Sequence, residues 1–150
     1  LNMANTVVTA YDISSDALLI ARDNAIRLGA AVNFQLKDAL QLTATEETFD
    51  IIVSNPPYIC DSERTEMMRN VLEYEPSTAL FVPDDDPLRF YRSIAEYGTS
   101  ALSHGGELYF EINARFANEV SAMLNALGYA EIEVRNDQFG RQRFVKSIRP

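Results

Sequence analysis

Four consecutive residues, Asn55, Pro56, Pro57 and Tyr58, combine groups that are suited to holding a reactive nitrogen. They directly follow Phe49–Ser54, an apolar run that is typical of a buried strand. The two prolines fix φ and remove two N–H donors, so the corner is stiff and its carbonyls are left as acceptors. The Asn55 side chain offers a donor and an acceptor, and Tyr58 offers a flat face. This corner therefore predicts a site for a planar –NH2 group, such as an amide or the exocyclic amine of a base.

Two acidic residues follow earlier predicted strands. Asp12 ends the β-branched run over residues 6–11, and Asp38 follows the run over residues 32–36. In a nucleotide-type fold, the acidic residue that ends the second strand accepts hydrogen bonds from ribose hydroxyls, and ligands bind at the carboxyl ends of the strands. We therefore expect Asp12 to bind ribose and Asp38 to accept from an adenine amino group. Either residue alone would equally suit a turn, but with Asn55 they predict one cleft that holds ribose, adenine and the reactive nitrogen.

The elements that must position these residues alternate along the chain. Apolar periodicity, turn residues and helix-ending glycines predict strands over 6–11, 32–36, 49–54, 107–112, 130–135 and 143–148, and helices over 17–28, 87–103 and 116–127. The charged segment 62–74 is expected to be a helix or a partly ordered cover. Alternating strands and helices followed by two strands predict an α/β fold with a mostly parallel sheet and an antiparallel carboxyl-terminal strand pair.

Composition limits the classes of function. The chain has 150 residues, enough for one domain, with 13 Lys and Arg against 22 Asp and Glu, a net charge of −9. This balance disfavours nucleic acid as the direct substrate, because such binding depends on basic side chains that neutralise phosphates. Cys60 and His104 are the only cysteine and histidine, so no disulfide framework and no metal site is expected, and a reducing cytoplasm is favoured. A catalytic Cys60 is the weaker alternative, since no histidine lies nearby. No segment predicts a membrane span.

The motifs together resemble those of the release factor glutamine methyltransferases, and the resemblance covers nearly all of the chain. The Asn-Pro-Pro-Tyr sequence is shared with N6-adenine and some N4-cytosine methylases. The Glu-Pro-x-x-Ala-Leu spacing at Glu75, Pro76, Ala79 and Leu80 is more particular to the glutamine enzymes, and so are Glu111-Ile112 and the short ending. The other matching segments are Ala10–Ser14, Ala25–Gly29, Phe49–Ile59, Gly105-Gly106 and Leu127–Tyr129.

The resemblance implies a class I (Rossmann-like) methyltransferase that uses S-adenosylmethionine. It implies methylation of the side-chain amide nitrogen (N5) of the glutamine in the Gly-Gly-Gln motif of peptide-chain release factors. By this resemblance Asp12, Asp38 and Asn55 contact the cofactor, while Asn55 and the Pro56 carbonyl hold the glutamine amide and Pro57 and Tyr58 complete the substrate corner. An N6-adenine-specific DNA or RNA methyltransferase is the alternative, and a non-enzymatic α/β binding module is a third.

The chain departs from the family pattern in two places. Asn113 stands where family members usually have glycine after Glu-Ile, so the substrate-facing loop is expected to differ. None of the six glycines forms the G-x-G of a cofactor-binding loop, which should lie about 20 residues before Asp12. We therefore expect residues 1–150 to be a partial catalytic domain, truncated at the amino terminus and lacking a strand between 6–11 and 49–54. Exposed strand edges would then favour self-association.

The missing glycine loop gives a first testable prediction. The 150-residue chain by itself is expected to bind S-adenosylmethionine weakly or not at all, because the backbone N–H groups that such a loop supplies are absent. Isothermal titration calorimetry on this chain measures the affinity directly. Tight binding of one cofactor per chain would contradict the expectation.

Overall fold

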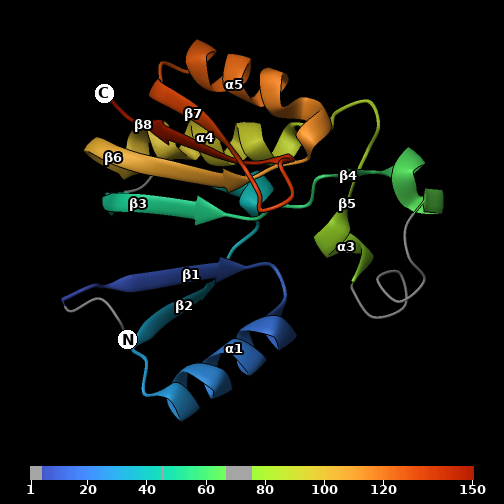
Figure 1. Cartoon of the computed structure of the whole chain (residues 1–150). Coiled ribbons are helices and arrows are strands. Elements are labelled where there is room, and N and C mark those ends of the chain that lie inside the picture. The colour runs from blue at the N-terminus through green and yellow to red at the C-terminus, as the bar shows by residue number, and fades with distance from the viewer. Residues whose placement is uncertain (1–4, 45, 67–75) are drawn as a thin grey trace. The chain divides into compact units, whose positions relative to one another are not determined.

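The computed structural model describes residues 5–44, 46–66 and 76–150 (Figure 1). The chain divides into two compact units, Leu1–Leu42 and Thr43–Pro150. Each unit has its own sheet, and each is a separate framework for part of the predicted site. That residues 1–150 form one partial catalytic domain stays a prediction.

The first unit is a strand–helix–strand segment in which both strands run in the same direction. Its elements are β1 (Val8–Asp12), α1 (Ser15–Leu28), β2 (Val32–Leu36) and the short 3-10 helix η1 (Ala39–Gln41). The register pairs Val8 with Val32 and Asp12 with Leu36. Because the strands are parallel, their carboxyl ends lie at the same edge of the sheet. The predicted strand over residues 32–36 is confirmed.

Local signals fix both ends of α1. The Ser14 hydroxyl oxygen accepts a hydrogen bond from the Ala17 backbone N–H at 3.2 Å, which is an N-cap. At the other end Gly29 has a φ of 65°, and the N–H of Ala30 donates to the Ala25 carbonyl at 2.8 Å. This is the left-handed glycine ending that the sequence predicts, and it turns the chain back toward β2.

The second unit is built on a four-stranded sheet. Its elements are β3 (Phe49–Ser54), β4 (Ile59–Cys60), η2 (Asp61–Glu66), α3 (Ser77–Leu80), β5 (Phe81–Val82), α4 (Arg89–Ala101), β6 (Leu102–Glu111), η3 (Ala114–Phe116), α5 (Ala117–Ala126), β7 (Ala130–Asn136) and β8 (Gln142–Ile148). The sheet order is β3-β6-β8-β7. The β3–β6 pair is parallel, whereas β8 pairs antiparallel with both β6 and β7. The predicted α/β fold with a mostly parallel arrangement of strands and an antiparallel carboxyl-terminal strand pair is confirmed.

Besides shifts of one or two residues at the ends of elements, the structure differs from the sequence prediction in these details. The helix predicted to reach residue 103 ends at Ala101, and β6 begins at once at Leu102. An irregularity between β3 and β6 follows, where a Cβ at Gly106 would lie 2.9 Å from the Ser103 carbonyl oxygen, so glycine is required. The parallel pair of β4 and β5, which joins Ile59 to Phe81, was not predicted. Most of the predicted cover, residues 67–74, and Glu75 lie outside the described residues.

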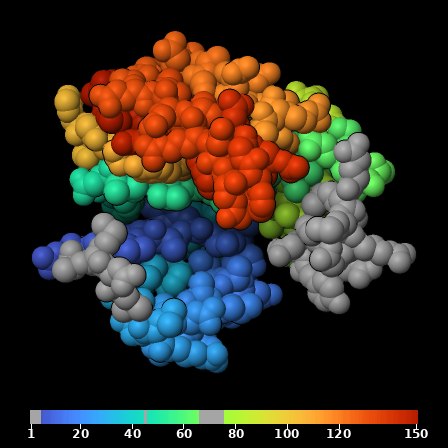
Figure 2. Space-filling view, viewed as in Figure 1, coloured from blue at the N-terminus to red at the C-terminus, as the bar shows by residue number. Residues whose placement is uncertain are grey.

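The two faces of the four-stranded sheet have different environments. The face that carries Leu108 and Phe110 is buried; α4 packs on β6, α5 packs on β7 and β8, and the two helices contact each other. Figure 2 shows the orange and red atoms of α5, β7 and β8 forming one continuous surface. The opposite face carries Glu107, Tyr109 and Glu111, which are only half-buried. Among the described residues, no helix has the length and apolar character needed to span a membrane.

A close contact inside this core gives a stability prediction. A Cβ added at Gly98 of α4 would lie 2.4 Å from the Tyr129 hydroxyl, which donates to the Ala95 carbonyl at 2.8 Å. The Gly98→Ala variant is expected to lose about 1 kcal/mol of unfolding free energy, because an overpacking cost of about 2 kcal/mol outweighs the ~1 kcal/mol gain in helix propensity. Urea denaturation of the chain measures this difference.

The Tyr129→Phe background serves as the control for Gly98→Ala. Without the hydroxyl the clash disappears, so the same substitution should cost less there. A Gly98→Ala variant at least as stable as the parent chain would contradict the packing argument.

Candidate active site

The predicted corner lies at the carboxyl end of β3 in the second unit. Asn55 is exposed, while Pro56 is buried and Pro57 is half-buried. Among the described residues no peptide bond is cis, and none supplies a hydrogen-bond partner to the Asn55 side-chain amide. A buried proline therefore fixes the backbone while the amide that precedes it stays available to a ligand. This is the arrangement expected for a group that receives a planar nitrogen.

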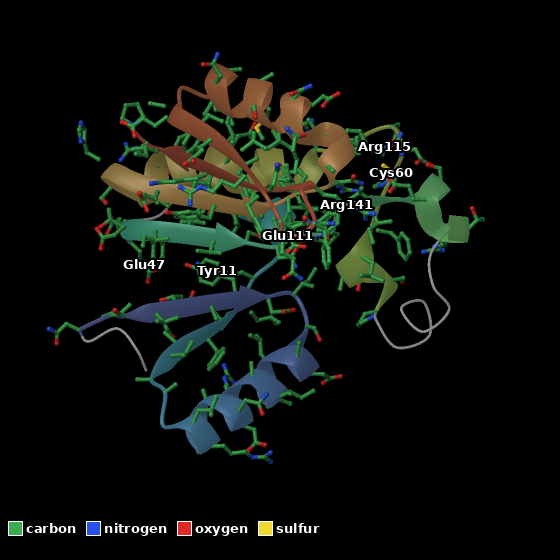
Figure 3. All side chains as sticks on the ribbon, in the orientation of Figure 1. Tyr11, Glu47, Cys60, Glu111, Arg115 and Arg141 are labelled. Carbon is green, nitrogen blue, oxygen red and sulfur yellow. The ribbon has the colours of Figure 1, made fainter. Side chains whose placement is uncertain are left out.

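Tyr58 is held by its hydroxyl through groups from two other strands. The hydroxyl donates to Oε1 of Glu111, the last residue of β6, at 2.8 Å, and it accepts from Nη1 of Arg143 on β8 at 3.3 Å. Figure 3 shows Glu111 where β6 ends. Burial, followed by the hydrogen bond to Glu111, raises the pKa of Tyr58 above its ordinary value, so the phenol stays neutral at physiological pH. Tyr58 therefore contributes a fixed, uncharged ring to the corner.

Asn113 holds the backbone of the same tyrosine. Its Nδ2 donates to the Tyr58 carbonyl at 3.1 Å and to Oε1 of Glu63 at 3.2 Å, while its Oδ1 accepts from the Arg115 N–H at 3.1 Å. Glu63 also forms an ion pair with Arg115 at 3.0 Å. A glycine at position 113 would have no side chain for these bonds. Asn113, where the resemblance led us to expect glycine, thus links the backbone of Tyr58 to the turn after β6.

Cys60, the candidate thiol, is buried and interacts with Glu63. Desolvation, and then the charge and hydrogen bond of Glu63, raise the pKa of the Cys60 thiol. A raised pKa keeps the sulfur protonated at neutral pH, and a protonated thiol is a poor nucleophile. The environment of Cys60 therefore favours a structural role. Among the described residues, no His, Cys, Asp and Glu side chains gather into a group that would bind a metal.

The two aspartates lie at the carboxyl edge of the first unit. Asp12 ends β1, and its Oδ1 accepts from the Ser14 N–H at 2.8 Å. Asp38 lies two residues beyond β2, where its Oδ1 accepts from the Leu40 N–H at 2.8 Å and its Oδ2 accepts from Gln41 Nε2 at 3.0 Å. A carboxylate has about four lone-pair sites, so both residues retain acceptor capacity. Carboxylates on adjacent parallel strands fit a nucleoside with its ribose hydroxyls and adenine amine.

Each unit thus brings together part of the predicted set. Asp12 and Asp38 share an edge in the first unit, and Asn55 to Tyr58 form the corner in the second. That all of them border one cleft stays a prediction. The sequence analysis assigned no role to Glu111 or Arg143, which hold Tyr58. The position of Glu111 at the end of a predicted strand was the available signal, because strand ends meet at the site edge.

Comparison with known folds defines the class of this chain. A family model described as "Methyltransferase domain" matches residues 1–74. A methyltransferase from Pyrococcus furiosus superposes with a TM-score of 0.69 at 20% identity, covering 99% of this chain and 65% of that one. The N-methyltransferase NodS from Bradyrhizobium japonicum, solved with S-adenosyl-L-homocysteine, gives 0.56 at 20% identity, covering 95% of this chain and 65% of NodS. The fold is that of a class I S-adenosylmethionine-dependent methyltransferase.

Sequence similarity is more particular than fold. A release factor glutamine methyltransferase from Bacteroides thetaiotaomicron is 47% identical over 149 residues, which is 99% of this chain and 54% of that protein. The resemblance to release factor glutamine methyltransferases that the motifs predicted is therefore confirmed. The chain spans about half the length of this curated relative.

Proposed function

We propose that this chain carries the chemical centre of a protein-(glutamine-N5) methyltransferase that acts on the Gly-Gly-Gln motif of peptide-chain release factors. The observation that carries the proposal is the exposed Asn55 amide beside a buried Pro56, at the carboxyl end of β3. The 47% identity to a relative named for this activity supports the same substrate. Release factors act in translation, so the site of action is the cytoplasm.

The protein's own contribution is to hold the nitrogen. The glutamine –NH2 donates one hydrogen to Asn55 Oδ1 and the other to the Pro56 carbonyl, and the Tyr58 ring packs against the amide plane. Both acceptors favour the positive charge that develops on the nitrogen during transfer. Bound S-adenosylmethionine supplies an activated methyl group, so the chemistry needs orientation rather than a protein nucleophile.

The first unit supplies the cofactor contacts. Asp12 would accept hydrogen bonds from the ribose hydroxyls and Asp38 from the adenine amine, and Asn55 of the second unit would also contact the cofactor. The support is chemical: Asp12 ends β1, Asp38 lies two residues beyond the parallel strand β2, and both keep acceptor capacity beyond their local bonds.

The alternative substrate is the exocyclic amine of adenine in DNA or RNA. It is kept because the corner accepts any planar –NH2 group, and a base amine is one. The net charge of −9 argues against it, since nucleic-acid binding needs basic side chains that neutralise phosphates. Binding of a protein loop does not require such basic side chains.

The test uses a chimera in which this chain replaces the matching 149 residues of the Bacteroides thetaiotaomicron relative, with the unaltered relative as the control. Chimera and radiolabelled S-adenosylmethionine are incubated with a release factor, with the same factor carrying Gln→Ala in Gly-Gly-Gln, and with adenine-containing DNA. Label on the glutamine, absent from the Gln→Ala factor, is the expected result. Label on DNA would support the adenine alternative, and label on neither would support a binding module.

A further inference from the structure

The hydroxyl of Tyr58 is linked to an acceptor that belongs to the sheet rather than to a loop. Glu111 is the last residue of β6, and its backbone carbonyl accepts from the Tyr91 hydroxyl of α4 at 3.2 Å. The next residue, Ile112, donates its N–H to the Arg143 carbonyl at 2.8 Å. The Glu111 backbone is therefore fixed by the core helix on one side and by β8 on the other.

The charged groups around this hydroxyl are one guanidinium and two carboxylates. Nη1 of Arg143 lies 4.0 Å from Glu111 Oε1, and Nε of Arg143 lies 3.9 Å from Asp137 Oδ2. The guanidinium is thus placed between two carboxylates while it also donates to Tyr58. Such a half-buried group of charges limits the side-chain orientations that satisfy all partners. The tyrosine ring is consequently held in one orientation before any substrate arrives.

We propose that Glu111 is a positioning residue for methyl transfer, which acts on the substrate only through the hydroxyl of Tyr58. This inference rests on the proposed function, in which the Tyr58 ring packs against the glutamine amide. Because the ring is already ordered, substrate binding does not have to restrict its rotation, and less conformational entropy is lost. The ring therefore aligns the nitrogen more effectively. Glu111 itself touches neither the substrate nor the cofactor.

The experiment is a double-mutant cycle in the chimera with Glu111→Ala, Tyr58→Phe and the combined variant. The Glu111→Ala variant is expected to lower kcat/KM for a Gly-Gly-Gln substrate about tenfold, the usual weight of one hydrogen bond to a charged group. The KM for S-adenosylmethionine should not change. Because Tyr58→Phe removes the hydroxyl through which Glu111 acts, Glu111→Ala should cost less than about twofold in that background. Glu111→Gln, which retains an acceptor oxygen, should restore most of the activity.

The same strand offers a matched control. Oε2 of Glu107 accepts from the Tyr109 hydroxyl at 2.7 Å, a bond of the same type that lies four residues earlier on β6 and involves no residue of the corner. Glu107→Ala is expected to leave kcat/KM and both KM values within about twofold of the parent, whereas a general loss of sheet stability would affect both variants alike.

The outcomes separate this inference from the proposed function. If the parent chimera does not methylate glutamine, the proposed function fails before any variant is compared. If the parent is active but Glu111→Ala costs the same factor with and without the Tyr58 hydroxyl, the positioning role is overturned. The same conclusion follows if Glu107→Ala is equally damaging, or if Glu111→Ala changes the KM for S-adenosylmethionine.

Discussion

Asn55→Ala in the chimera is expected to lower kcat for glutamine methylation by about 100-fold to 1000-fold. The variant removes one of the two proposed acceptors for the hydrogens of the reacting amide, and loss of one such preorganised contact typically costs about 3–4 kcal/mol of barrier. Because Asn55 is exposed and has no hydrogen-bond partner among the described residues, its loss should hardly affect folding. Initial rates with radiolabelled cofactor and a saturating Gly-Gly-Gln substrate measure the effect.

Asn125→Ala is the control for this variant, since Asn125 is an exposed asparagine on α5 in the same unit. It should retain nearly full kcat. A change in kcat below about threefold for Asn55→Ala would contradict the proposed role of the corner in methyl transfer. If only the KM for S-adenosylmethionine rose, Asn55 would be a cofactor contact and not the amide acceptor.

The second large effect concerns the first unit. Asp12→Ala in the chimera is expected to raise the KM for S-adenosylmethionine by about tenfold to 100-fold, because the ribose hydroxyls lose a charged acceptor, worth roughly 1.5–3 kcal/mol per hydrogen bond. The KM for the Gly-Gly-Gln substrate should stay within about twofold, since the proposed role of Asp12 is to contact the cofactor and not the substrate. Steady-state kinetics with each substrate varied in turn separate the two constants.

Asp12 also has a local role, because its Oδ1 accepts from the Ser14 N–H at 2.8 Å. Ser14→Ala therefore serves as the control: it removes the N-cap of α1 and reports the cost of disturbing this turn without removing the carboxylate. The proposed ribose contact is rejected if Ser14→Ala raises the cofactor KM as much as Asp12→Ala does.

The stiffness of the corner arises in two stages. Pro56 and Pro57 restrict the backbone by covalent geometry alone, which needs no partner. The Tyr58 side chain has free torsions, and it depends on Glu111 and Arg143 for its orientation. The backbone of the corner is thus restricted by local sequence, whereas the orientation of its tyrosine is fixed by tertiary contacts.

The sequence by itself determined the features that depend on neighbouring residues. The strand Phe49–Ser54, the proline corner and the glycine ending of α1 all follow from apolar runs, fixed φ angles and a left-handed turn. Asp12 and Asp38 could be placed at strand ends for the same reason. Recognition of the methyltransferase class followed, because these local motifs occur in a fixed order along the chain.

Only the tertiary structure decided which distant groups meet. Tyr58 bonds to Glu111 and Arg143, which are 53 and 85 residues away along the chain. The insertion of β8 between β6 and β7 brings Arg143 to this point. Strand order and register arise from the packing of the whole sheet, and no local pattern encodes them. The position of the corner at a strand end could therefore be predicted from the sequence, whereas the groups that hold Tyr58 in place could not.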